Sequence, residues 1–217
     1  MSGGGTSLSR PVAARRPLPR RHEVCVLVSG GLDSCVLVVE LAKRYRQVHP
    51  VFIRQGLRWE SAELRALRRF LKAVHLPAPV VLDLPVRDLY GPHWSVTGKG
   101  APGAQSPDEN VYLPGRNLLL LSKAAVYCGQ RGIGVIAVGT LAGNPFADAT
   151  PQFFRAFGRL AGLRVRAPYR QLTKAQVIRR GRGLPLHLTF SCLAPRRGRS
   201  CGRCNKCAER ARAFLRL

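Results

Sequence analysis

The sequence predicts an α/β domain built on an open parallel sheet, followed by a small C-terminal segment with four cysteines. Three observations support this prediction. Short apolar runs alternate along the chain with longer helical patterns, as in successive βαβ units. The first apolar run ends in a glycine-rich turn, and the four cysteines gather near the C-terminus at short, regular spacings.

The first half of the chain is expected to supply three strands and two helices. Residues 23–28 are almost wholly apolar, which is typical of a strand buried on both faces of a parallel sheet. Further strands are predicted at 48–53 and 80–84, and helices at 34–45 and 58–74. The second helix is amphipathic, because Leu64, Leu67 and Leu71 recur at helical spacing.

The second half continues the alternation. Helices are predicted at 117–127, 151–160 and 173–180, strands at 133–138 and 163–167, and a last helix through residue 212. Two stretches interrupt the pattern. Residues 85–110 have little periodicity, which in a compact domain favours a functional lid. Residues 141–150 follow the fourth strand, at the sheet edge where open parallel sheets bind ligands.

These patterns divide the chain into three parts: a flexible basic tail at 1–22, the α/β domain at 23–184 and the four-cysteine segment at 185–217. With 46% hydrophobic residues, the chain can bury a core and is not a disordered polypeptide. No apolar run approaches the ~18 residues that cross a bilayer, so we expect no membrane contact. Residues 1–21 contain no apolar stretch of the signal-peptide type. We therefore expect a cytoplasmic protein with reduced cysteines.

The net charge of +25 is extreme, with 36 basic and 11 acidic residues. Residues 155–217 alone hold fifteen arginines, two lysines and one glutamate. Such an excess attracts polyanions by counterion release. A compositional preference for arginine also explains it, so a nucleic-acid contact is compatible with the sequence but not required by it.

A glycine-rich hexapeptide, residues 29–34, lies between the first strand and the first helix. Glycines let the chain turn tightly there, and the free N–H groups at the helix start attract an anion. An ordinary capped turn is the simpler interpretation. The loop is neither a Walker A loop nor a Gly-x-Gly-x-x-Gly fingerprint. The whole hexapeptide instead resembles the pyrophosphate loop of the ATP-pyrophosphatase superfamily, whose members activate a carboxylate or carbonyl by transferring AMP to it.

The four C-terminal cysteines follow the spacing C-x8-C-x2-C-x2-C, at Cys192, Cys201, Cys204 and Cys207. Four thiolates suit tetrahedral Zn²⁺ and leave no open position, so one structural zinc per chain is expected. An iron–sulfur cluster is the competing interpretation, because four-cysteine sets serve both. Disulfides are disfavoured in a reducing compartment. The remaining cysteines, Cys25, Cys35 and Cys128, fall in apolar segments and are expected in the core.

With both features in hand, the chain is similar to the 7-cyano-7-deazaguanine synthases from Val24 to Phe214. Besides the loop and the cysteines, the resemblance rests on four short motifs: Arg54-Gln55-Gly56, Pro114-Gly115-Arg116-Asn117, Leu172-Thr173-Lys174-Ala175 and Thr189-Phe190-Ser191-Cys192. It implies an ATP-dependent ligase that converts 7-carboxy-7-deazaguanine and ammonia to the nitrile, through adenylated carboxylate and amide intermediates. Because a glutaminase domain does not fit in this length, free ammonia is the expected nitrogen donor.

The resemblance also implies site residues. Catalytic roles fall to Asp33, Lys174 and Arg116, with Asp33 beside Mg²⁺. ATP contacts fall to the loop and one helix start: Val28, Ser29, Gly30, Gly31, Leu32, Asp33, Ser34 and Asn117. Substrate contacts fall to Arg54, Gln55, Asn144, Phe146 and Asp148. Independently of any family, Lys174 lies in the first turn of a capped helix, where a cation opposes the helix dipole and indicates a nearby anion.

One segment departs from the family pattern. Typical members carry Tyr-Pro-Asp-Cys-Arg-Pro-Glu after the fourth strand, where this chain reads Phe-Ala-Asp-Ala-Thr-Pro-Gln at 146–152. A ligase acting on a related acid is therefore one alternative. An ATP-pyrophosphatase-type ligase or thiolase that modifies tRNA is another. A purely nucleic-acid-binding module would leave the phosphate loop unexplained. The sequence is also compatible with a homodimer.

Overall fold

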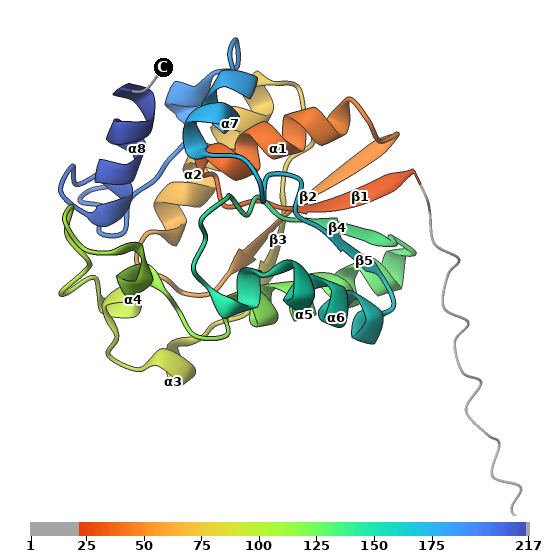
Figure 1. Cartoon of the computed structure of the whole chain (residues 1–217), viewed down its shortest axis with the longest axis horizontal. Helices are drawn as coiled ribbons and strands as arrows, with labels where there is room; N and C mark the ends of the chain where they lie inside the picture. Colours follow the sequence, from red (N-terminus) through yellow and green to blue (C-terminus); the bar gives the residue numbers. More distant parts are fainter. Residues whose placement is uncertain (1–21, 216–217) are drawn as a thin grey trace, which may run out of the picture.

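The structure is a computed structural model that describes residues 22–215 of the chain. Five parallel strands form one sheet in the order β3-β2-β1-β4-β5 (Figure 1). Their bounds are β1 Glu23–Leu27, β2 Gln47–Arg54, β3 Val80–Asp83, β4 Val135–Ala137 and β5 Arg164–Arg166. The predicted α/β class and parallel sheet are confirmed. The predicted basic tail, apart from His22, lies outside the described residues.

Helices cover both faces of the sheet (Figure 1). Buried side chains of α1, α2 and α7 pack on one face, and those of α5 and α6 pack on the other. The central strand shows why both faces are apolar: Val24 and Val26 face the first layer, while Cys25 between them faces the second. The helix bounds are α1 Leu32–Ala42, α2 Glu60–Ala73, α5 Arg116–Arg131, α6 Pro151–Ala161, α7 Lys174–Arg180 and α8 Asn205–Leu215.

The strand order creates a crevice at one end of the sheet. The chain builds β1, β2 and β3 in one direction and then returns to place β4 on the other side of β1. The helices that follow β1 and β4 therefore leave toward opposite faces, and a gap opens at the carboxyl ends of these two strands. The predicted phosphate loop begins at this gap, directly after β1.

The connection from β3 to α5 is more ordered than its lack of periodicity indicates. It contains the single-turn helices α3 (Arg87–Tyr90) and α4 (Trp94–Thr97) and the 3-10 helix η1 (Asp108–Val111). Trp94 stacks on Trp59 with ring centroids 5.7 Å apart, and the N–H of Arg58 donates to the carbonyl of Ser95 at 2.8 Å. Contacts with distant residues supply the order, which a local pattern does not record.

The C-terminal segment packs on this connection. Asn205, buried at the start of α8, donates to the carbonyl of Ser106 at 2.8 Å and to the Asp108 carboxylate at 3.1 Å. Gly103 also forms an antiparallel bridge with Cys204. The cysteine segment and the connection therefore support each other beside the crevice.

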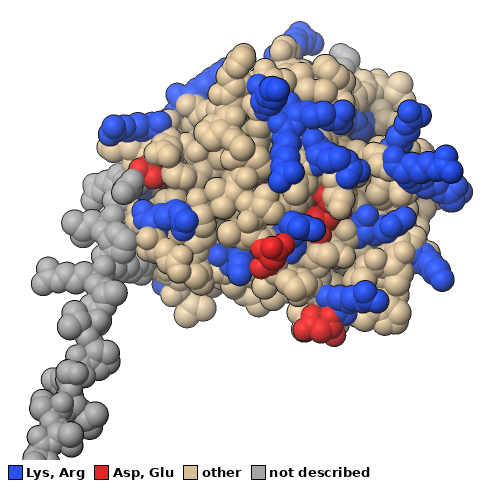
Figure 2. Space-filling model, turned by 180° about the vertical axis from the view of Figure 1, so that it is seen from behind, with Lys and Arg blue, Asp and Glu red and all other residues tan. Residues whose placement is uncertain are grey.

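Basic side chains cover much of the surface. Figure 2 shows many lysines and arginines and few acidic side chains on the face opposite to that of Figure 1. Within the described residues, no helix combines the length and the apolar character that a bilayer crossing requires.

Candidate active site

The phosphate loop is held by its own hydroxyl groups. The Ser34 hydroxyl accepts from the Ser29 N–H at 3.1 Å and donates to the Gly31 carbonyl at 3.2 Å. The Ser29 hydroxyl accepts from the Gly31 N–H at 3.2 Å. No side chain caps the start of α1, which follows directly. Its first N–H groups and its dipole therefore remain available to an anion in the crevice.

Gly30 is the point where three segments of the fold meet. Its φ is +77°, and a Cβ atom there would overlap the backbone carbonyl oxygen of Glu63 in α2. The Gly30 carbonyl accepts from the N–H of Phe190 at 2.9 Å. The loop thus lies directly between α2 and the C-terminal segment, and only glycine fits.

We expect Gly30→Ala to weaken nucleotide binding and to lower the melting temperature by several degrees. A positive φ costs a residue with a Cβ roughly 1–2 kcal/mol, and the overlap with α2 adds to this cost because backbone atoms cannot move aside. Gly183→Ala is a matched control, since Gly183 has a φ of +87° and no atom within 4 Å of the added Cβ. Equal melting temperatures and nucleotide affinities for the two variants would contradict this account.

A chain of charges links the loop to α7 and α8. Lys174 Nζ lies 3.3 Å from Asp33 Oδ2 and 2.7 Å from Glu209 Oε1. The other oxygen of Glu209 lies 2.8 Å from Lys206 Nζ. Thr173 and Gln176 form the predicted capping box, which fixes where α7 begins. Asp33 and Lys174 are thus brought together, whereas Lys206 and Glu209 were not predicted as site residues.

Burial and pairing shift the pKa values of these groups in different directions. Burial raises the pKa of Asp33 above its usual range, although Lys174 opposes the shift. Burial also works against the charge on Glu209, but Lys174 and Lys206 outweigh it and hold the pKa of Glu209 down at about 2. Asp33 Oδ1 is buried without a hydrogen-bond partner. One carboxylate oxygen beside the loop is thus left for a ligand or a cation.

The start of α5 forms the opposite wall. Arg116 Nε donates to Gln55 Oε1 at 3.0 Å. Asp148 accepts from the backbone N–H of Asn117 at 2.9 Å and from its side-chain amide at 3.2 Å. Asp148 therefore caps α5, and its two oxygens are occupied by Asn117. The loop at 146–149 and the start of α5 are held as one unit.

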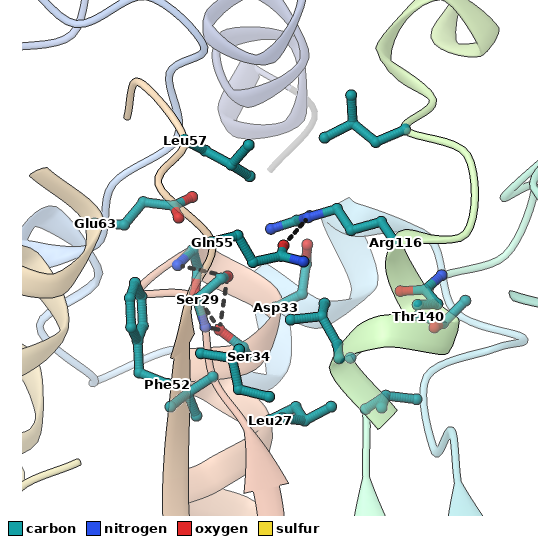
Figure 3. Close-up of a pocket in the computed structure, with 18 of the residues that line it drawn as sticks. Leu27, Ser29, Asp33, Ser34, Phe52, Gln55, Leu57, Glu63, Arg116 and Thr140 are labelled. Carbon is teal, nitrogen blue, oxygen red and sulfur yellow. Dashed lines mark hydrogen bonds between the residues drawn. The ribbon is translucent and has the colours of Figure 1, made fainter. Parts of the chain in front are cut away.

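Two adjoining cavities open at the crevice. The first, of about 280 Å³, has an apolar floor that includes Leu27, Val51 and Ile53. The second, of about 340 Å³, extends toward Lys174 and Glu209. Both are lined by Ser29, Gly31, Asp33, Glu63, Arg116, Asn144 and Phe146, among others. The structure therefore gathers most of the predicted site residues around one bipartite cavity (Figure 3).

Among the predicted ATP and substrate contacts, Gly30, which packs against α2, and Arg54 line neither cavity. The side chain of Arg54 is 52% exposed, and its Nε lies 3.8 Å from carboxylate oxygens of both Glu60 and Asp83. Strand β2 continues through this residue, so alternation turns Arg54 away from the side of Ile53 and Gln55. The sequence motif did not reveal this alternation because it was interpreted as a loop after the strand.

Glu63 is a cavity residue that the sequence analysis missed. Its side chain points from α2 into the first cavity, toward Arg116 (Figure 3). Burial raises the pKa of Glu63 to about 8, with Arg116 opposing the shift and Glu60 adding to it. A signal was present, because Glu60 and Glu63 lie one turn apart on the helix face that carries Leu67.

The four cysteines form a compact cluster near this cavity. Their sulfur atoms all lie within 4.8 Å of one another, and Cys192 and Cys204 are buried. The N–H groups of Leu193 and Cys201 donate to the sulfurs of Cys204 and Cys192, each at 3.3 Å. A tetrahedral zinc ion lies ~2.3 Å from each of its four sulfur ligands, which brings the sulfur atoms close to one another. The sulfur atoms of this cluster are similarly close, so the cluster could hold a metal. Cys25, Cys35 and Cys128 are buried in the core, as predicted.

Comparison with known proteins identifies the family. The family described as "Queuosine biosynthesis protein QueC" matches residues 23–217, from the first strand through the four cysteines. The chain belongs to this family. The QueC match thus spans the sheet, the phosphate loop and the four-cysteine cluster together, and it confirms the resemblance seen in the sequence.

Curated relatives that match this chain include 7-cyano-7-deazaguanine synthases. The 7-cyano-7-deazaguanine synthase of Anaeromyxobacter dehalogenans (strain 2CP-C) is 31% identical, over 87% of this chain and 89% of that protein. The enzyme of the same name from Xanthomonas campestris pv. campestris (strain B100) is 34% identical, over 87% of this chain and 91% of its own length. The similarity to QueC proteins therefore extends over most of both chains.

Solved structures with similar backbones are more distant. A predicted subunit of tRNA methyltransferase from Methanocaldococcus jannaschii gives a TM-score of 0.49 at 15% identity, covering 72% of this chain and 73% of that one. The U34-tRNA thiolase NcsA from Methanococcus maripaludis, with its [4Fe-4S] cluster, gives a TM-score of 0.49 at 11% identity, covering 91% and 65%.

Proposed function

We propose that this protein makes 7-cyano-7-deazaguanine from 7-carboxy-7-deazaguanine, ammonia and ATP, as a step in the synthesis of queuosine precursors. One observation carries the proposal beyond family membership. The phosphate loop opens onto two adjoining cavities that share Arg116. A nucleotide and an acid can therefore meet at a common wall, as transfer of AMP to a carboxylate requires.

The nucleotide is expected to bind along the loop. Its phosphates would accept from the N–H groups at the start of α1, from the hydroxyls of Ser29 and Ser34, and from Lys174. Its base and ribose would extend into the second cavity, beside Leu141 and Lys174, which leaves the first cavity to the acid. Asp33 Oδ1, a buried acceptor without a partner, fits a divalent cation. Mg²⁺ bound there would neutralise charge on the phosphates.

The chemistry needs no protein nucleophile. The substrate carboxylate, held by Arg116, attacks the α-phosphorus of ATP, and pyrophosphate leaves. Ammonia then attacks the acyl carbon, AMP leaves, and one proton is released with the amide. The amide oxygen then attacks the α-phosphorus of a second ATP and pyrophosphate leaves. Loss of AMP together with both protons of the amide nitrogen forms the nitrile. The residues contribute orientation and charge stabilisation in a cavity that is partly screened from water.

The cysteine cluster supplies structure in this proposal. Four thiolates in a closed set would hold one Zn²⁺ per chain and leave no position for a substrate. The cluster lies where the C-terminal segment contacts both the loop, through Phe190 and Gly30, and the 102–108 stretch of the connection, through Asn205. Reduced thiols are available in the cytoplasm, which is where we expect the enzyme to work.

The purified protein is expected to form the nitrile when incubated with 7-carboxy-7-deazaguanine, ATP, Mg²⁺ and ammonium. Mass spectrometry should detect the nitrile, and each activation step should release one AMP and one pyrophosphate. Without ammonium, the amide and the nitrile should both be missing. Pyrophosphate release that required RNA, with no change in the deazapurine acid, would instead support a tRNA-modifying ligase.

A further inference from the structure

Glu63 and Arg116 face each other across the first cavity without touching. Glu63 comes from α2 and Arg116 from α5, and both point into the same space (Figure 3). Glu63 is partly buried, and its carboxylate makes no hydrogen bond or ion pair within the described residues. A desolvated carboxylate opposite a guanidinium indicates a ligand that carries donors at one end and an anion at the other.

Gln55 supplies a third, independent polar group in this cavity. Its side chain is only 1% exposed, and its carbonyl oxygen accepts from Arg116 Nε. Because a guanidinium only donates, this bond fixes which end of the amide is which. The amide nitrogen Nε2 is left buried without a partner. Figure 3 shows the Gln55 amide beside the Arg116 guanidinium, with Glu63 facing them across the cavity. The cavity wall therefore presents an acceptor, a donor and a cation to one space.

One edge of the proposed substrate carries the complementary groups. The exocyclic amine and the ring N–H are donors, the ring carbonyl next to them is an acceptor, and the carboxylate follows on the neighbouring ring. We propose that Glu63 determines specificity by accepting from the amine and the ring N–H. Gln55 Nε2 then donates to the carbonyl and Arg116 to the carboxylate. This inference rests on the proposed function.

The electrostatics of Glu63 favour such a ligand. Burial raises the pKa of this carboxyl to about 8, so its ionised form is poorly stabilised in the empty cavity. Two parallel N–H donors match the two oxygens of a carboxylate and stabilise the ionised form. Adenine offers one amine beside an acceptor nitrogen, which a carboxylate repels. Glu63 would therefore keep the base of ATP out of the position of the acid.

The test compares two acids with wild-type protein and Glu63→Gln. One acid is 7-carboxy-7-deazaguanine, and the other lacks only the exocyclic amine. We expect the wild type to prefer the first acid by roughly 10- to 100-fold in kcat/KM, the range for an unpaired charged hydrogen-bond partner. In Glu63→Gln, KM for the first acid should rise and the preference should fall to within about threefold.

Two further measurements separate this role from a structural one. KM for ATP should be unchanged in Glu63→Gln, because the substituted atoms do not contact the nucleotide in this arrangement. Glu109→Gln makes the same chemical change at an exposed residue that lines neither cavity, and should keep the wild-type preference. Calorimetry with each acid reports binding without turnover.

The outcomes are distinct. A wild type that converts the acid, together with a Glu63→Gln variant that keeps the full preference for the amine, would overturn the role of Glu63 and leave the proposed function standing. A wild type that neither binds nor converts 7-carboxy-7-deazaguanine would overturn both. We expect Glu63→Gln to lose the preference for the acid with the amine and to keep its affinity for ATP. The wild type and Glu109→Gln should both keep that preference.

Discussion

Replacing Asp33 with alanine is expected to reduce ATP-dependent turnover by at least about a hundredfold, the scale on which one preorganised charge at a reacting centre acts. Asp33 lies in the first turn of α1, beside the phosphate loop, and its Oδ1 atom is buried without a partner. Removing it leaves no carboxylate at this point to hold a cation against the phosphates. Release of AMP and pyrophosphate is the direct measurement.

The fold should survive this substitution. Lys174 keeps its 2.7 Å ion pair with Glu209, so no buried cation is left alone. The variant also removes a carboxyl whose pKa burial raises, which means that its charge is costly in the folded protein. We therefore expect a melting temperature close to that of the wild type. Asp33→Asn, of the same size, provides a second test of the charge itself.

Asp88→Ala is the matched control, because Asp88 is exposed on α3 and lines neither cavity. It should retain wild-type release of AMP and pyrophosphate. If folded Asp33→Ala and Asp33→Asn also retained it, the catalytic role of the loop carboxylate would be wrong.

Cys204→Ser is expected to lose most of the bound zinc and to lower the melting temperature by roughly 10 °C, at about 2–4 °C per kcal/mol for a chain of this size. Cys204 is buried, and its sulfur accepts from the Leu193 N–H. Its backbone forms an antiparallel β-bridge with Gly103. Loss of the metal should therefore loosen the C-terminal segment together with the connection on which it packs. Metal analysis and thermal melting measure the two effects.

Turnover should fall as an indirect result. The segment contacts the phosphate loop through Phe190 and reaches Lys174 through Glu209. Its loosening would misplace groups that bind the nucleotide, so KM for ATP should rise in Cys204→Ser.

Cys128→Ser is the control for the metal, since Cys128 is buried in a different cluster of the core and should leave the zinc content at about one per chain. Iron with inorganic sulfide, and an absorption band around 400 nm in anaerobically purified wild type, would contradict the zinc assignment.

Local patterns were sufficient for much of this protein. Strand β1 was predicted from its apolar run, and α2 from leucines at helical spacing, because such periodicities depend only on neighbouring residues. Helix α5 begins at Arg116 and continues to Arg131, where a left-handed Gly132 ends it, slightly beyond the predicted bounds. The phosphate loop and the cysteine spacing were likewise readable, since each site draws its ligands from a short stretch of chain.

The tertiary structure alone decided which distant residues meet. Glu63 reaches the cavity because α2 packs over Gly30, and Glu209 reaches Lys174 because α8 packs near α7. Arg54 lies outside both cavities because β2 continues one residue beyond the end of its apolar pattern. Such contacts depend on strand order and on how helices cross the sheet. Neither is recorded in the spacing of neighbouring residues, so the sequence pointed to the loop and the four cysteines but not to Glu63 and Glu209, which lie beside them.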